Sequence, residues 1–199
     1  LPNGQSILKE IVFHNDQYEA DLTITTTGFK NGYQLSLGTN FGITDWQNSM
    51  GGNVGAITMI DWKIVSDQPE NTTVTHSSGV TWFGIQDKYY MSAFLQPGKN
   101  NMTGSVSVQG LSKQEVTASV HIPSGDQPVR LTLYAGPKEY DRLASYHNYL
   151  EESIDFGWFI YGSWLPVRLV AKPLFYVLRF IYNMTQNYGA AIILLTIFV

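Results

Sequence analysis

The chain contains no cysteine, few charged residues and no acidic residue after Asp155. The absence of cysteine excludes a disulfide scaffold, a thiolate metal site and a cysteine nucleophile. Only 14% of the 199 residues are charged, and the net charge of −4 argues against a general nucleic-acid-binding protein. Aromatic residues also make up 14% of the chain, which favours a folded core over intrinsic disorder. The length suffices for one sizeable core.

Charge divides the chain into two unlike parts. Residues 1–156 have a net charge of −7, whereas residues 157–199 have a net charge of +3 from Arg168, Lys172 and Arg179. The acidic first part is suited to water. The second part, which is basic and apolar, is not suited to water.

Residues 1–135 are predicted to form an antiparallel β-sandwich, so the fold class is mainly β. Apolar and polar residues alternate at 18–25, 116–122 and 129–134, with the period of half-buried strands. Clusters of glycine, asparagine, serine and proline separate these runs and mark turns. The pattern is irregular around residues 40–60, and no strand boundaries are assigned there.

A helix is predicted over residues 136–152, where Gly136 and Pro137 close the last strand. Leu143, Tyr146 and Leu150 follow one another at three- and four-residue intervals, so they share one helix face. We expect this helix to pack on the edge of the sandwich.

Residues 153–187 are predicted to form an aromatic junction followed by an amphipathic interfacial helix. At 100° per residue the three cations fall within about 40° of one another, beside a broad apolar surface. Pro166 and Pro173 interrupt the segment, so the main helix is expected at 173–186 with Pro173 in its first turn. The residues expected at the membrane interface are Arg168, Lys172, Pro173, Leu174, Phe175, Leu178, Arg179, Phe180 and Ile181.

This pattern is typical of a helix that lies in a bilayer surface, with its cations reaching anionic headgroups. The alternative is a buried helix inside a larger protein. The uncharged run at 188–199 favours the membrane, and we expect it to be the start of a truncated transmembrane helix.

The sequence predicts no catalytic, cofactor or metal site. Its four histidines are far apart and form no H-x-x-x-H or H-E-x-x-H motif. No nucleophile elbow, P-loop or dinucleotide fingerprint occurs either.

Several segments together resemble the YidC family of bacterial membrane protein insertases, most specifically from residue 133 onward. The segments that carry the resemblance are Gly79-Val-Thr-Trp-Phe-Gly-Ile-Gln-Asp-Lys-Tyr-Tyr90, Leu133-Tyr-Ala-Gly-Pro-Lys-Glu-Tyr-Asp-Arg-Leu143, Asp155-Phe-Gly-Trp-Phe159, Ala171-Lys-Pro-Leu-Phe175 and Asn187-Tyr-Gly-Ala-Ala-Ile-Ile-Leu-Leu-Thr196.

The resemblance implies a periplasmic β-supersandwich of the galactose mutarotase type, of which residues 1–135 would be the later and incomplete part. It implies a non-enzymatic insertase and chaperone of the bacterial inner membrane that needs no cofactor. Its partners would be the lipid bilayer, nascent membrane proteins, and the Sec translocon with its accessory subunits. The arginine of the family's hydrophilic groove would follow Val199, so no groove residue is assigned here.

Two other functions remain open from the sequence. A carbohydrate-binding or epimerase-like sandwich could stack sugars on Trp46, Trp62 and Trp82, with His76 or His121 as acid or base. Core packing explains the same aromatic residues, and a shared fold is a weak argument for function. The third possibility is a tail-anchored structural protein whose membrane span begins at 188–199.

Overall fold

The computed structural model describes residues 4–15, 17–39, 55–67, 71–98, 100–112, 115–125, 127–154 and 165–198. The chain forms two compact units. The strands and the short helices up to Ile154 belong to the first unit, and two C-terminal helices belong to the second. Each unit is described separately below.

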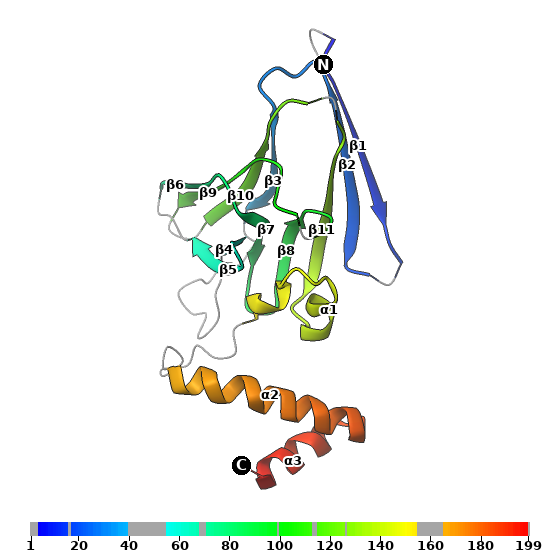
Figure 1. The fold of residues 1–199 in the computed structure, drawn as a ribbon, viewed down its shortest axis with the longest axis vertical. Coiled ribbons are helices and arrows are strands. Elements are labelled where there is room, and N and C mark those ends of the chain that lie inside the picture. Colours follow the sequence, from blue (N-terminus) through cyan, green and yellow to red (C-terminus); the bar gives the residue numbers. More distant parts are fainter. Residues whose placement is uncertain are drawn as a thin grey trace. The chain divides into compact units, whose positions relative to one another are not determined.

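The first unit consists of two antiparallel sheets, which confirms the predicted mainly β fold (Figure 1). The larger sheet has the strand order β1 (Ser6–Phe13), β2 (Glu19–Thr27), β11 (Val129–Pro137), β8 (Tyr90–Leu95), β7 (Val80–Gln86), β4 (Gly55–Ile60) and β5 (Lys63–Asp67). The smaller sheet has the order β3 (Tyr33–Thr39), β10 (Glu115–Ile122), β9 (Ser105–Ser112) and β6 (Thr73–His76). The three alternating segments of the sequence correspond to β2, β10 and β11.

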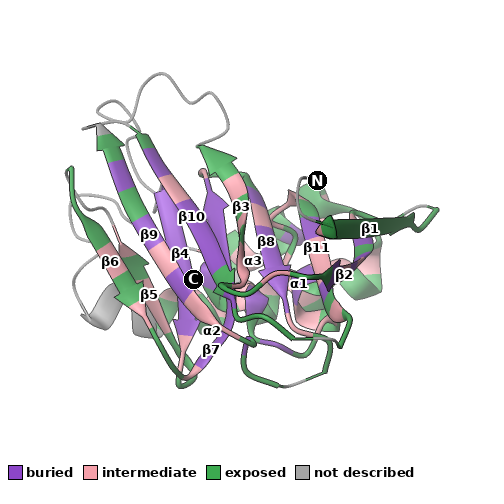
Figure 2. Cartoon of the chain, turned by 90° about the horizontal axis from the view of Figure 1, so that it is seen from above, coloured by how far each residue is buried: buried purple, intermediate pink, exposed green. Residues whose placement is uncertain are grey.

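The main core lies between the two sheets. Alternate residues of β10, including Val116 and Ala118, are buried, and so are Leu22 and Ile24 on β2 (Figure 2). Strand β7 is buried along its whole length, because the larger sheet is covered on both faces. A buried two-sided strand loses the period of two, which explains why its sequence shows no alternation.

A second core covers the other face of the larger sheet. It joins Trp82, Met91 and Tyr134 of the sheet to Leu143 and Leu150 from the segment after β11. Tyr146 packs at its border, with its ring 5.5 Å from that of Tyr134 in an edge-to-face arrangement. The three residues predicted to share one face therefore do contact one core.

The single helix predicted over 136–152 is not observed. Helix α1 covers Tyr140–Ser145 only, and a 3-10 helix, η2, covers Leu150–Ser153. Pro137 remains in β11, where it pairs with Tyr90. His147 and Tyr149 have positive φ angles of 55° and 60°, and this left-handed backbone breaks the helix between the two buried leucines.

The second unit contains α2 (Leu165–Thr185) and α3 (Tyr188–Phe198). The prediction that the main helix begins at Pro173 was wrong, because α2 continues through Pro173 and begins eight residues earlier. Pro166 lies in the first turn of α2, where a backbone N–H would have no helical hydrogen-bond acceptor. Pro173 leaves the carbonyl of Leu169 without its helical donor, a local cost that the strong helix formers Ala171, Lys172 and Leu174 help to offset.

A tight corner joins α2 to α3. Gln186 has a positive φ of 50°, and the rings of Tyr182 and Tyr188 stack across the corner with centroids 3.9 Å apart. The Asn187 side chain caps α3 by accepting a hydrogen bond from the Ala190 amide over 3.2 Å. Among the residues that the structure describes, no helix is both long and apolar enough to cross a membrane.

Candidate functional site

All nine residues predicted at the membrane interface lie in α2. They are Arg168, Lys172, Pro173, Leu174, Phe175, Leu178, Arg179, Phe180 and Ile181. The structure describes the side chains of all of them except Arg168. Their assignment to a membrane interface remains a prediction that the helix geometry makes physically reasonable.

The cations of α2 occupy one stripe of the helix. Lys172 and Arg179 are seven residues apart, which places them within about 20° of each other around the axis. The guanidinium of Arg179 lies 5.9 Å from the ring centroid of Phe175, one turn before it. This cation–π contact directs the charge along the helix surface rather than across the apolar face.

The opposite side of α2 is apolar. Val170, Leu174, Val177 and Ile181 lie within about 40° of the direction opposite Lys172. None of the described side chains from Val170 to Thr185 is buried, although most of them are apolar. Met184 is 73% exposed and Phe180 is 66% exposed.

Three residues of this apolar face were not among the predicted site residues, namely Val170, Val177 and Met184. The helical arithmetic that placed the cations could have identified them. Val170 lies before the predicted helix of residues 173–186, whereas Val177 and Met184 lie within it, so helical spacing alone was sufficient to place these two.

Helix α3 is also largely uncovered. Ile192, Ile193, Leu194 and Ile197 are exposed, whereas Ala191 is fully buried near the corner with α2. Because α3 carries no charged residue, its whole surface is apolar or weakly polar. Such a surface favours lipid or further protein over water.

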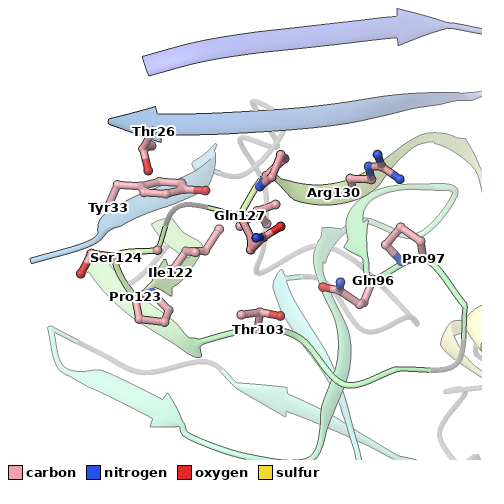
Figure 3. Close-up of a pocket in the computed structure, with 13 residues that line it drawn as sticks. Thr26, Tyr33, Gln96, Pro97, Thr103, Ile122, Pro123, Ser124, Gln127 and Arg130 are labelled. Atoms are coloured by element: carbon pink, nitrogen blue, oxygen red, sulfur yellow. The ribbon is translucent and has the colours of Figure 1, made fainter. Parts of the chain in front are cut away.

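The sandwich contains a cavity of about 600 Å³ (Figure 3). Two buried polar atoms in its lining, the Tyr33 hydroxyl and Gln96 Oε1, have no hydrogen-bond partner among the described residues. Burial raises the pKa of Tyr33, so its hydroxyl stays protonated. The described lining includes no tryptophan and no histidine.

The residues proposed for sugar stacking are not brought together. Trp82 is fully buried in the second core, Trp62 is exposed on the β4–β5 turn, and Trp46 lies outside the described residues. His121 is exposed on β10. His76 bonds Asp67 Oδ2 over 2.6 Å, and this contact links β6 to β5, the edge strands of the two sheets.

Metal binding has no support in the described residues. No three histidine or carboxylate side chains gather there with the spacing of a metal site. In the His76–Asp67 pair, which joins β6 to β5, both side chains are mostly shielded from solvent.

The chain is similar to known proteins. A family model described as the YidC periplasmic domain matches residues 1–177. A protein of Pelobacter propionicus named "Membrane protein insertase YidC" is 28% identical over 98% of this chain and 36% of its own length. Proteins of the same name from Geobacter metallireducens and Oleidesulfovibrio alaskensis are 37% and 35% identical, over 60% and 67% of this chain and 22% and 24% of their own lengths. The chain thus spans about a third or less of the length of these curated relatives.

Proposed function

Because the chain belongs to the YidC periplasmic domain family, we propose that it is the sandwich and membrane-proximal part of a non-enzymatic insertase and chaperone. The insertase would reside in the bacterial inner membrane, with the β domain in the periplasm. It would assist the insertion and folding of inner-membrane proteins, alone or with the Sec translocon and its accessory subunits. The relatives carry the name of insertases and give no support to the carbohydrate-binding alternative.

The observation that carries this proposal is the uncovered apolar face of α2 opposite a cationic stripe. A helix of this kind lies in the plane of the membrane, with its apolar side chains below the headgroups. Full burial of one leucine or phenylalanine contributes roughly 1.5–3 kcal/mol, so partial insertion of several such residues suffices for stable binding. Lys172 and Arg179 would meet anionic headgroups.

Helix α3 would begin a membrane-spanning segment. Its 11 residues extend about 16 Å, roughly half of a hydrocarbon core of about 30 Å. The exposed isoleucines and the lack of charge support this assignment. The stacked rings of Tyr182 and Tyr188 would then join α2, which lies in the plane of the membrane, to α3, which enters the bilayer.

The sandwich would remain in the aqueous phase and face protein partners. The net charge of −7 over residues 1–156 argues against nucleic acid as a partner. In the full insertase, anchorage by α2 would keep this domain close to nascent membrane proteins as they enter the bilayer.

A matched pair of substitutions tests the role of α2. Leu178→Asp places a carboxylate on the apolar side, and Asn183→Asp places the same charge beside the cationic stripe. We expect Leu178→Asp to weaken sedimentation with vesicles of phosphatidylethanolamine and phosphatidylglycerol by about tenfold, and Asn183→Asp to weaken it less than threefold. Equal effects of the two substitutions would contradict the proposal.

A further inference from the structure

Two exposed aromatic side chains contact each other on the first unit. The rings of Trp62 and Tyr149 meet edge to face with centroids 5.4 Å apart, and the side chains are 57% and 45% exposed. Trp62 lies on the turn between β4 and β5, whereas Tyr149 directly precedes η2. The pair therefore joins two segments that are far apart in the sequence.

The backbone holds both residues in a conformation that aromatic side chains rarely adopt. Ile60 pairs with Lys63, so Asp61 and Trp62 form a two-residue hairpin turn with φ angles of 47° and 64°. Such turns favour asparagine and glycine. Tyr149 has a φ of 60°. Residues kept in unfavourable backbone regions concentrate at functional sites, because the rest of the fold must stabilise them there.

Neighbouring contacts fix the pair rigidly. The residue before Tyr149, Asn148, accepts a hydrogen bond of 2.9 Å from Trp82 Nε1, and the residue after it, Leu150, is fully buried. On the other side, the Asp61 amide donates to the carbonyl of Gly79 over 3.0 Å. Hydrogen bonds and a buried neighbour therefore hold the backbone next to these two exposed aromatic residues in place.

The pair lies close to the point where the chain leaves the first unit. Tyr149 is five residues before Ile154, which packs against the second core. Between Ile154 and Leu165 the sequence has ten residues, of which five are aromatic. Even fully extended, this connection reaches only about 35–40 Å. When α2 lies on a bilayer, the chain length alone therefore limits the distance between Ile154 and Leu165 to about 40 Å.

The charges around the pair are mixed. Lys63 and His147 are exposed beside it, and Asp61, Glu151 and Glu152 are also close in the sequence. An ideal Cβ on Gly79 would come within 2.5 Å of Asp61 Oδ1, so this carboxylate points over Gly79. The contact is therefore suited to amphipathic burial rather than to attraction by charge.

We propose that Trp62 and Tyr149 form a second membrane contact, through which the sandwich inserts two aromatic rings among the headgroups of the bilayer that holds α2. Tryptophan and tyrosine combine an apolar ring with a polar tip and are enriched at membrane–water interfaces. The inference rests on the proposed function, because it requires that α2 binds the bilayer. It adds a fixed orientation of the sandwich relative to the lipid surface.

The absence of cysteine in the chain permits a direct test with single fluorescent labels. One label replaces Lys63 beside the pair, a second replaces exposed Gln109 on β9, and a third replaces Val177 on α2. Each labelled 199-residue chain is mixed with vesicles of phosphatidylethanolamine and phosphatidylglycerol that carry a nitroxide quencher on some headgroups. We expect quenching at positions 63 and 177 to exceed that at position 109 at least threefold.

The aromatic pair itself is tested by two further substitutions in the chain labelled at position 63. Tyr149→Ala should reduce the quenching at least twofold, whereas Tyr149→Phe should preserve it, with circular dichroism confirming that both variants fold. Quenching at 177 without quenching at 63 would overturn the second contact and leave the proposed function intact, and it is also the result expected if the pair binds a protein. No quenching at 177 would overturn the proposed function, and the second contact with it.

Discussion

The indole nitrogen of Trp82 donates a hydrogen bond of 2.9 Å to the main-chain carbonyl of Asn148, and both groups are buried. This bond attaches the segment between α1 and η2 to β7, an inner strand of the larger sheet. Tyr149, whose ring contacts that of Trp62, directly follows Asn148 in the chain. The packing of the second core therefore determines the position of Tyr149.

Substitution of Trp82 by phenylalanine should destabilise the sandwich. The change removes the donor and leaves the Asn148 carbonyl buried without a partner, which costs about 1–3 kcal/mol, and the smaller ring adds a cavity. The free energy of unfolding in urea measures the loss. Trp62→Phe is the control, because an exposed side chain should change stability by about 0.5 kcal/mol or less. A loss no greater than that of the control would contradict the role given to this bond.

Gly84 should tolerate no side chain. A Cβ at this position of β7 would lie 2.6 Å from the main-chain oxygen of Ser92 and 3.0 Å from the Cβ of Ala93. Because β7 is a fully buried inner strand of the sheet, Gly84→Ala should cost about 1–3 kcal/mol through overpacking. Gly125→Ala is a matched control, since a Cβ there has open space. Thermal unfolding that shifted equally in both variants would refute the prediction.

The stability of the sandwich should fall at alkaline pH. Burial raises the pKa of Tyr134 to about 12, and burial followed by a hydrogen bond to Glu19 raises the pKa of Tyr146. Tyrosines in the unfolded chain ionise near pH 10, so the folded state binds these protons more tightly. Stability should be unaffected below about pH 9 and should decrease as pH rises from about 10 through 12.

Urea titrations at pH 8, 9, 10 and 11 measure this dependence. Tyr146→Phe removes one of the two groups and should give a flatter decrease above pH 10 than the parent chain. Tyr149→Phe removes an exposed tyrosine instead and should leave the slope as it is. A slope unchanged by Tyr146→Phe would show that other groups cause the alkaline loss.

The strands with strict alternation were predictable, because one face of β2 or β10 meets the core and the other does not. The interruption between α1 and η2 was not predictable from residue pattern. Leu143, Tyr146 and Leu150 have helical spacing, yet the contacts of Asn148 and Leu150 with the second core impose left-handed angles at His147 and Tyr149. Here tertiary packing outweighs local helix preference.

The cationic stripe of α2 could be derived from spacing alone, since a helical period requires no knowledge of the fold. The start of α2 could not, because proline is compatible both with the first turn and, at a cost, with the interior. The Trp62–Tyr149 contact was invisible in the sequence, since it joins residues that only the β4–β5 hairpin and η2 bring together.

The most direct test of the account is a nitroxide scan of single cysteines along α2 from Val170 to Met184 in the membrane-bound chain, with oxygen and a water-soluble nickel chelate as relaxants. An in-plane helix predicts oxygen accessibility that peaks at 170, 174, 177, 181 and 184, and chelate accessibility that peaks at 172, 176, 179 and 183, with a period of about 3.6 residues. Accessibilities that vary together, or that show no helical period, would contradict the placement of α2 at the lipid surface.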